Sequence, residues 1–235
     1  MMALRGECFR HQKGRITQRI RIGDKTYFIK QHHGVGFKEI IKNLLQLRLP
    51  VISARNEWLA IQKLNSLGVL VPGIAAFGER GWNPASKESF ILMEEITPVI
   101  SLEEMAKSFK ETPPPFAFKQ ELIERVAKIA KIMHENGMNH RDFYLCHFLL
   151  KEQGKLLYLI DLHRAEIRPL TRKRCIIKDL SGLYFSSKDS GLTQRDYYRF
   201  MKWYSNKTLR EILEKEKLFW KKVRARGERL YNNHT

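Results

Sequence analysis

The sequence predicts an α+β protein of two lobes, with an antiparallel sheet in the N-terminal lobe and mainly helices in the C-terminal lobe. Isoleucines alternate with polar residues over residues 15–22, and a second apolar run follows at 26–30, as expected for two paired, half-buried strands. Apolar residues recur with helical period over 118–133, and the chain beyond Leu180 is mostly helical and polar in pattern. We expect the lobes to span residues 1–96 and 97–235.

The remaining elements follow from local signals. Gly23-Asp24 predicts the turn between the first two strands, and Gly68 and Gly137 each predict the end of a helix. Ser101 offers an N-cap for a short helix. The further elements are expected, in order, at Phe37–Leu49 (helix), Ala54–Leu67 (helix), Phe90–Met93 (strand), and the two strands of a hairpin, Phe148–Leu150 and Leu156–Ile160.

The charge is the unusual feature of the composition. Lys and Arg number 43 against 25 Asp and Glu, a formal net charge of +18, which predicts an anionic partner such as nucleic acid, an anionic membrane face, or an acidic substrate or protein. Three cysteines without a C-x-x-C pair argue against a disulfide framework or a structural zinc site, and they suit a reducing compartment. Without an apolar segment long enough to span a membrane, a cytosolic protein or one attached from the cytosolic side is expected.

The predicted Phe37–Leu49 helix has two interpretations. Its apolar face, which includes Phe37, Ile40 and Leu44, can brace the first lobe as ordinary core. Alternatively, its basic amphipathic character suits an anionic membrane or an acidic partner, of which an acyl carrier protein is one example.

Four residues fit the requirements of phosphoryl transfer from ATP. Lys30 ends a strand, as a lysine that holds phosphates would, and Glu57 lies on the inward stripe of a helix, where a carboxylate needs a cation. Asp142 follows a long helix in His140-Arg141-Asp142, and Asp161 follows the hairpin. Because the open end of a hairpin brings its flanks together, we expect His147 and Asp161 to be neighbours, with Asp142 a few residues away.

This order resembles the protein-kinase-like superfamily, with Tyr27-Phe28-Ile29-Lys30 as its lysine strand and His140-Arg141-Asp142 as its catalytic loop. The run from Met138 to Leu150, and the block from Lys42 to Trp58, resemble the lipopolysaccharide core heptose(I) kinase family more closely. The resemblance extends from about Phe28 to Asp179. It implies a bilobal kinase-like fold and ATP- and Mg²⁺-dependent phosphorylation of the first heptose of the inner core, at the cytoplasmic face of the inner membrane.

The resemblance also implies site residues. ATP is expected between the lobes near Met93–Ile96, with Glu94 in that connection and with Lys30 steadying the phosphates. Asp142 is the expected catalytic carboxylate and Asp161 the Mg²⁺ ligand. A basic tract is expected to meet lipid A phosphates and core carboxylates through Arg168, Arg172, Lys173 and Arg174.

Three departures from protein kinases shape the prediction. No G-x-G-x-x-G loop is present, and His147 stands where protein kinases place Asn. Imidazole is a poor Mg²⁺ ligand, so His147 is expected to bond Asp142 or a phosphate, with metal ligation left open. Asp161-Leu162-His163 replaces Asp-Phe-Gly and no Ala-Pro-Glu follows, which favours a metabolic kinase.

The residues leave alternatives open. The acceptor can be another sugar, a small molecule such as an aminoglycoside, or a protein hydroxyl. A nucleic-acid-binding module would use the charge, although the aromatic residues do not alternate with the basic runs, so no nucleic acid is expected. A pseudokinase scaffold conflicts with the presence of both aspartates.

Overall fold

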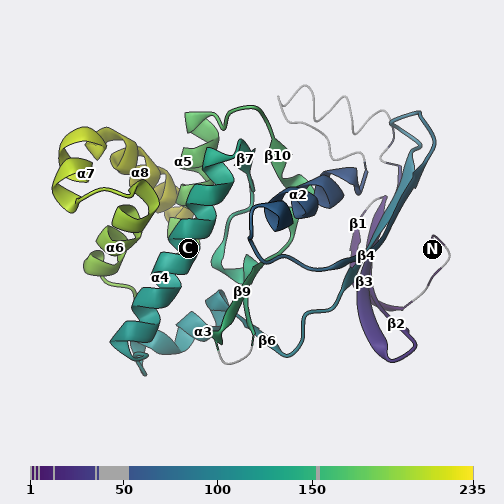
Figure 1. The fold of residues 1–235 in the computed structure, drawn as a ribbon, viewed down its shortest axis with the longest axis horizontal. Coiled ribbons are helices and arrows are strands. Elements are labelled where there is room, and N and C mark those ends of the chain that lie inside the picture. The colour runs from purple at the N-terminus through teal and green to yellow at the C-terminus, as the bar shows by residue number, and fades with distance from the viewer. Residues whose placement is uncertain are drawn as a thin grey trace. The chain divides into compact units, whose positions relative to one another are not determined.

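The computed structural model describes residues 2, 4, 6–12, 14–34, 36, 53–151 and 154–234. The chain forms two compact units: unit 1 is Met1–Thr97 with Asp161–Arg164, and unit 2 is Pro98–Ile160 with Ala165–Thr235. The predicted α+β class, with its antiparallel sheet in the N-terminal part and its helices in the C-terminal part, is confirmed (Figure 1). The predicted Phe37–Leu49 helix lies outside the described residues.

Unit 1 is built on a five-stranded sheet in which every pair of neighbouring strands is antiparallel. Both strands expected from the isoleucine alternation are present, and the sheet also contains a strand before them and one at residue 74 that the pattern did not predict. In spatial order the strands are β1 (Glu7–Gln12), β2 (Arg15–Ile22), β3 (Lys25–His33), β5 (Glu88–Glu94) and β4 (Ile74–Arg80).

The two faces of this sheet have different roles. Ile20, Ile29 and Leu92 form a buried cluster on one face. Successive side chains of a strand point to opposite faces, so Lys30 projects from the other face. That face is covered by α2 (Arg55–Ser66), whose Trp58 ring stacks on Phe77 of β4 at 4.7 Å between centroids. The alternation of β3 therefore places a lysine beneath a helix.

Helix α2 ends where the sequence predicted. Gly68 has a φ of +76°, in the left-handed region that favours glycine, and the Val69 amide donates to the Leu64 carbonyl at 3.0 Å. This turn reverses the chain toward β4. The helix itself is held over the sheet face that carries Lys30 by the stacking of Trp58 on Phe77 and by the ion pair of Glu57 with Lys30.

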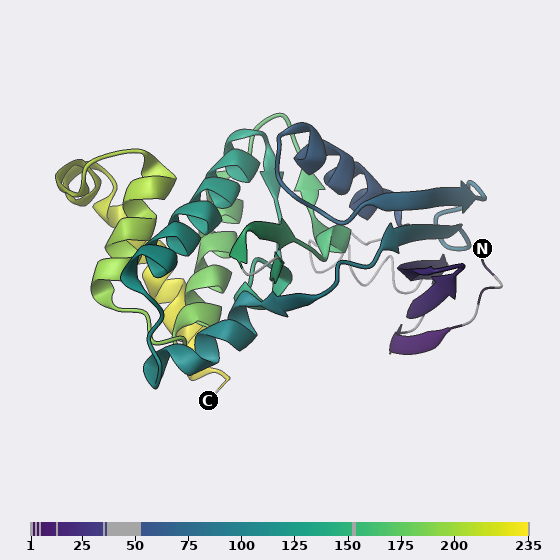
Figure 2. The ribbon, with the colours of Figure 1, turned by 60° about the horizontal axis from the view of Figure 1, so that its bottom comes forward.

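Unit 2 is mainly helical (Figure 2). Helix α4 packs beside α6, and α5 packs beside α8, around a core that includes Met133, Phe143 and Phe148. Its helices are α3 (Leu102–Lys107), η1 (Ser108–Lys110), α4 (Phe116–Glu135), η2 (Leu145–His147), α5 (Lys173–Ser187), α6 (Gln194–Ser205), α7 (Leu209–Lys215) and α8 (Lys217–Asn232). Its strands are β6 (Val99–Ser101), β7 (Met138–Asn139), β8 (Phe148–Lys151), β9 (Leu156–Leu159) and β10 (Glu166–Ile167).

Local signals again set the ends of these elements. The Ser101 hydroxyl accepts from the Glu104 amide at 3.1 Å, which caps α3 as expected. Gly137 follows α4 with a φ of +74°, and a Cβ there would lie 1.9 Å from the Arg168 carbonyl oxygen. Glycine is therefore required both for the turn and for the close approach of the chain beside β10.

The predicted hairpin is confirmed. Strands β8 and β9 are antiparallel, with Phe148 opposite Leu159. One residue beyond that pair, the Ile160 amide donates to the His147 carbonyl at 3.0 Å. The hairpin thus joins His147, at the end of the predicted catalytic loop, to the residue that directly precedes Asp161.

Candidate active site

Lys30 is the centre of an ion cluster within unit 1. Its Nζ donates to Glu57 Oε1 at 2.7 Å and to Asp161 Oδ1 at 2.9 Å. Strand β3, helix α2 and the segment Asp161–Arg164 each contribute one of the three residues, and the 3₁₀ turn η4 (Leu162–Arg164) packs on α2. The structure therefore brings together three of the residues singled out in the sequence.

Burial makes these charges interdependent. The Glu57 side chain is 1% exposed, and its Oε2 has no hydrogen-bond partner among the described residues. Burial acts to lower the pKa of Lys30, but the Coulombic attraction of Glu57 and Asp161 outweighs it, so the pKa of Lys30 lies above its ordinary value. The lysine is held charged in one position, as phosphate binding requires.

Asp161 is held ionised by contacts with His163 and Lys30. Burial acts to raise the pKa of its carboxyl, but the hydrogen bond from His163, at 2.7 Å between Nδ1 and Oδ1, and the charge of Lys30 lower the pKa well below its ordinary value. The residue also has a φ of +62°, an uncommon conformation for a non-glycine residue. Such conformations concentrate at functional sites.

The predicted catalytic loop lies in unit 2 and is ordered by main-chain contacts. The Asp142 carbonyl accepts from the Tyr144 amide at 3.1 Å and pairs with His147 Nδ1 at 2.7 Å. The His140 ring is fully buried and its Nε2 lies 3.0 Å from the Ile160 carbonyl oxygen. His147 therefore contacts the Asp142 main chain, one of the two roles expected for it.

Asp179 is the residue that sequence reasoning missed as part of this site. It is 1% exposed in the middle of α5, and its carboxylate accepts from the His140 amide at 2.6 Å and the Arg141 amide at 2.8 Å. His134 Nε2 lies 3.4 Å from the same carboxylate. Arg141 has a φ of +75°, so Asp179 fixes an unfavourable backbone just before Asp142. The signal that could have identified Asp179 in the sequence is an aspartate at an inward-facing position of a predicted helix.

The basic tract is partly used within unit 2. Arg168 donates to Asn139 Oδ1 at 2.9 Å and forms an ion pair with Glu166, which also pairs with Arg141 at 3.1 Å. By contrast, three other residues predicted to bind substrate are exposed at the start of α5: Arg172, Lys173 and Arg174.

The remaining predicted contact, Glu94, is exposed at the end of β5, with Lys25 Nζ 3.8 Å away. The cluster of Lys30, Glu57 and Asp161 belongs to unit 1, whereas Asp142 and His147 belong to unit 2. The ATP, metal and substrate roles of all these residues stay predictions.

The donor chemistry at Asp161 fits Mg²⁺. Its carboxylate is ionised, and Mg²⁺ prefers oxygen ligands, commonly one or two carboxylates with substrate phosphates and water. No group of three or more His, Cys, Asp or Glu side chains is arranged to hold a metal among the described residues. A protein cage is therefore not the kind of site that this part of the chain offers.

Unit 2 also holds an apolar cavity of about 360 Å³ among helices α3 to α8. Leu122, Val126, Leu183, Met201 and Trp220 line it, and basic residues of α8 contribute to the same lining: Lys217, Lys221 and Arg224. Within the described ranges, no helix is long and apolar enough to cross a membrane.

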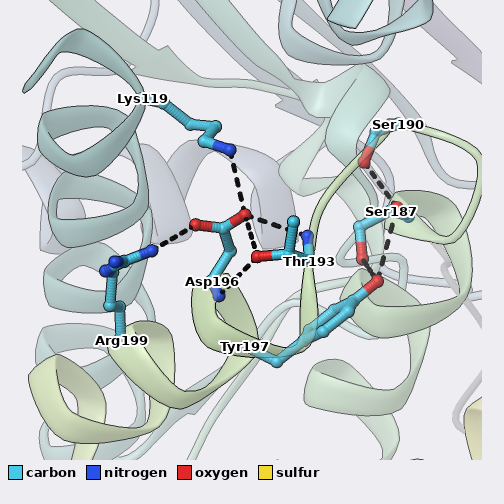
Figure 3. A network of polar contacts seen from close by, with 7 residues as sticks. All are labelled: Lys119, Ser187, Ser190, Thr193, Asp196, Tyr197 and Arg199. Atoms are coloured by element: carbon cyan, nitrogen blue, oxygen red, sulfur yellow. Dashed lines mark hydrogen bonds and ion pairs between the residues drawn. The ribbon is translucent and has the colours of Figure 1, made fainter. Parts of the chain in front are cut away.

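Lys119 and Asp196 belong to the lining of this cavity. They are part of a polar network centred on the buried Asp196, which is drawn in Figure 3. The Asp196 carboxylate accepts from Lys119 at 3.0 Å, from Arg199 at 2.7 Å and from the Thr193 hydroxyl at 2.8 Å. Thr193 and Asp196 form a reciprocal capping box at the start of α6. The cavity wall is thereby anchored by a satisfied buried charge.

Two features define a phosphotransferase of the protein-kinase-like class. One is a lysine on the sheet that is paired with a carboxylate on a helix. The other is a His-Arg-Asp loop whose backbone amides are bound by a buried aspartate. Comparison with known proteins gives the family. The model of the lipopolysaccharide kinase (Kdo/WaaP) family matches residues 1–204, and the chain belongs to this family.

Named relatives agree with this assignment. The chain is 45% identical to the lipopolysaccharide core heptose(I) kinase WaaP of Pseudomonas aeruginosa and 46% identical to that of Escherichia coli K12, in both cases over 97% of this chain and 88% of the relative. It also resembles a solved structure described as WaaP in complex with acyl carrier protein, with a TM-score of 0.84 and 40% identity over 97% of this chain and 90% of that one. The predicted family, and with it an ATP-using sugar kinase of lipopolysaccharide biosynthesis, is confirmed.

Proposed function

We propose that this chain transfers the γ-phosphoryl group of ATP to a hydroxyl of the first heptose in the lipopolysaccharide inner core. The observation that carries the proposal is the Lys30–Glu57–Asp161 cluster in a chain 45% identical, over nearly its whole length, to a heptose(I) kinase. Phosphoryl transfer depends mainly on positioning and on charge stabilisation, and the cluster supplies both.

Each residue has a defined part in this reaction. The acceptor oxygen attacks the γ-phosphorus, the bond between that phosphorus and the β–γ bridging oxygen breaks, and ADP leaves. Asp142 orients the sugar hydroxyl and takes its proton, while Lys30, fixed by Glu57, holds the phosphates. His147 keeps the loop in register through the Asp142 carbonyl.

We propose Asp161 as the protein ligand of Mg²⁺, since its carboxylate is ionised and half-buried. When bound, Mg²⁺ neutralises charge that develops on the phosphates. Lys30 and His163 orient the Asp161 carboxylate for this task. Glu94 and His147 are proposed to contact ATP, and the exposed cations Arg172, Lys173 and Arg174 the anionic groups of the acceptor.

Substitution of Asp142 tests the reaction directly. Asp142→Asn removes the proton acceptor at nearly constant volume, so transfer from labelled ATP to purified core oligosaccharide is expected to fall by roughly 10³-fold. The matched control is Asp189→Asn, because the Asp189 side chain is 70% exposed. Undiminished transfer by Asp142→Asn, with the melting temperature unchanged, contradicts the assignment.

Core oligosaccharide lacking the first heptose separates the proposed acceptor from others. Transfer to that truncated acceptor, to an aminoglycoside or to a protein at a comparable rate would favour a different substrate with the same chemistry.

We further propose an acyl carrier protein as a partner, with its acyl chain in the apolar cavity of unit 2. Each buried methylene contributes about 0.8 kcal/mol, and Lys217, Lys221 and Arg224 in the lining suit an acidic carrier. Met201→Trp should fill the cavity and weaken binding of purified acylated carrier, while binding of the unacylated carrier stays the same. Equal weakening of both forms would contradict insertion of the chain.

We propose that the protein acts at the anionic cytoplasmic face of the inner membrane, because its net charge is +18 and its proposed acceptor is lipid-linked. Co-sedimentation with anionic vesicles, lost at high salt and absent with neutral vesicles, is the expected result. Equal sedimentation with both vesicle types would oppose this location.

A further inference from the structure

The first three strands of unit 1 place two arginines and a histidine on the sheet face that carries Lys30. The antiparallel register sets Arg10 opposite Thr17 and Thr17 opposite Lys30, and directly opposed residues share a face. Arg15 lies opposite His32 in the same register. Residues two apart on a strand point to the same face, so the pair Arg15 and His32 projects from the same face as Thr17 and Lys30.

These residues line one small pocket with Lys30 and Asp161. The charge of Lys30 is met by two carboxylates, whereas Arg10 and Arg15 add two further positive charges to the lining. A guanidinium has five N–H donors, so each arginine can bind an anion in addition to its partners in the protein. The pocket is therefore suited to a multiply charged anion.

His32 supplies a second, independent sign of a ligand. It is 3% exposed, and its Nδ1 is buried without a hydrogen-bond partner among the described residues. A buried polar nitrogen without a partner is costly, and such exceptions require an explanation. With a proton on Nδ1, the ring can donate to an oxygen of an anion that enters the pocket.

Protein kinases cover the phosphates of ATP with a glycine-rich loop of pattern G-x-G-x-x-G, and this chain has no such motif. We propose that Arg10 and Arg15, assisted by Thr17 and His32, hold the phosphate chain of the nucleoside triphosphate in place of that loop. This inference rests on the proposed ATP-dependent function. Arginine binds phosphate oxygens through two parallel N–H donors, which gives both affinity and orientation.

We call the group of Arg10, Arg15, Thr17 and His32 the cradle. Calorimetric titration of the full chain with three ligands tests it: ATP, inorganic tripolyphosphate and adenosine. Arg10→Gln and Arg15→Gln should each raise the Kd of ATP and of tripolyphosphate roughly tenfold, the loss of one charge-assisted contact, and leave adenosine unchanged. Arg15→Lys keeps the positive charge but loses the paired N–H donors of the guanidinium, so an intermediate rise in Kd of about threefold is expected.

Arg21→Gln is the matched control. Arg21 lies on β2 like Arg15, is exposed, and donates to the Gly23 carbonyl, so the same charge is removed away from the pocket. Its nucleotide affinity should match that of the unaltered chain. Arg10 is itself exposed, so its variant keeps the test open if Arg15→Gln fails to fold.

The outcomes separate two kinds of failure. In the first, Arg10→Gln binds ATP and tripolyphosphate as tightly as Arg21→Gln does, and heptose phosphorylation is intact. That result overturns the cradle and leaves the proposed function standing. Tripolyphosphate binding that depends on both arginines, in a chain that phosphorylates no heptose, supports the cradle and removes the proposed function. Weakening of adenosine to the same extent as ATP overturns a phosphate-specific role.

Discussion

The ion cluster of unit 1 and the predicted catalytic loop of unit 2 are both held in position, but by different interactions. Lys30, Glu57 and Asp161 position one another through charged side chains. The segment at His140 and Arg141 is positioned instead through its backbone amides, which a single buried carboxylate binds. Ion pairs can be re-formed when a ligand arrives, whereas a buried backbone anchor keeps one geometry. We therefore expect the ion cluster to adjust when a ligand binds and the segment at His140 and Arg141 to stay rigid.

The largest expected effect is at the anchor of the loop. Asp179→Ala leaves two backbone donors unsatisfied in a buried region, so the free energy of unfolding should fall by about 3–5 kcal/mol. Denaturant unfolding measures this loss, and Asp142-dependent transfer should be lost with it. A loss below about 1 kcal/mol would show that the loop does not depend on Asp179, and the comparison would fail.

The ion cluster should respond to removal of its cation differently from the loop. Lys30→Met leaves Glu57 buried without its partner and should lower the free energy of unfolding by about 3 kcal/mol. The double variant Lys30→Met with Glu57→Gln should recover part of that stability, because the buried charge of Glu57 is gone while Asp161 keeps its contact with His163.

Activity should not follow stability in this pair of variants. Both variants lack the lysine that we propose holds the phosphates, so steady-state phosphate transfer should stay roughly 10²-fold or more below that of the unaltered chain. Recovery of transfer in the double variant would mean that Lys30 serves the fold alone.

A smaller effect is expected from pH. Burial, followed by the charges of Arg15 and His163, lowers the pKa of His32 to about 3, against about 6.5 in the unfolded chain. The neutral ring is favoured in the folded state, so its contribution is complete above about pH 6.5 and is lost as the pH falls toward 3.

Between pH 7 and pH 5 this loss amounts to about 2 kcal/mol of unfolding free energy. His32→Gln should remove that part of the pH dependence, whereas the neighbouring exposed His33→Gln should leave the slope unchanged. Denaturant titrations at several pH values measure this slope of unfolding free energy against pH. Equal slopes for the two variants would mean that His32 does not lie in a buried, positively charged environment.

The smallest expected effect concerns a buried carboxylate with a local role. Thr193→Ala removes one side of the capping box with Asp196 but leaves Lys119 and Arg199 in place, so a loss of about 1 kcal/mol is expected in thermal or denaturant unfolding. A loss as large as that of Asp179→Ala would make the cap, rather than the loop anchor, the key support of unit 2.

Much of the fold could be predicted because its signals are local. The isoleucine alternation of 15–22, the stop at Gly68 and the hairpin at 148–159 each depend on a few neighbouring residues, and all three are present. Strand β1, with the sequence ECFRHQ, carries no clear alternation and was missed. Its pairing partner decides its structure, and that information lies outside the segment.

The candidate site divides in the same way. Residue order alone predicted the kinds of residue at the site: a lysine at a strand end, a carboxylate on an inward helical stripe, and aspartates after a helix and after a hairpin. The folded chain was needed to show that Lys30 contacts both Glu57 and Asp161, which are 27 and 131 residues away. It was also needed to show that Asp179 binds the loop from 39 residues away. The same holds for the pocket that Arg10, Arg15 and His32 share. The reason is physical. Period and capping depend on short-range geometry along one segment, whereas charge pairing depends on strand register and helix packing, which form only when distant segments meet.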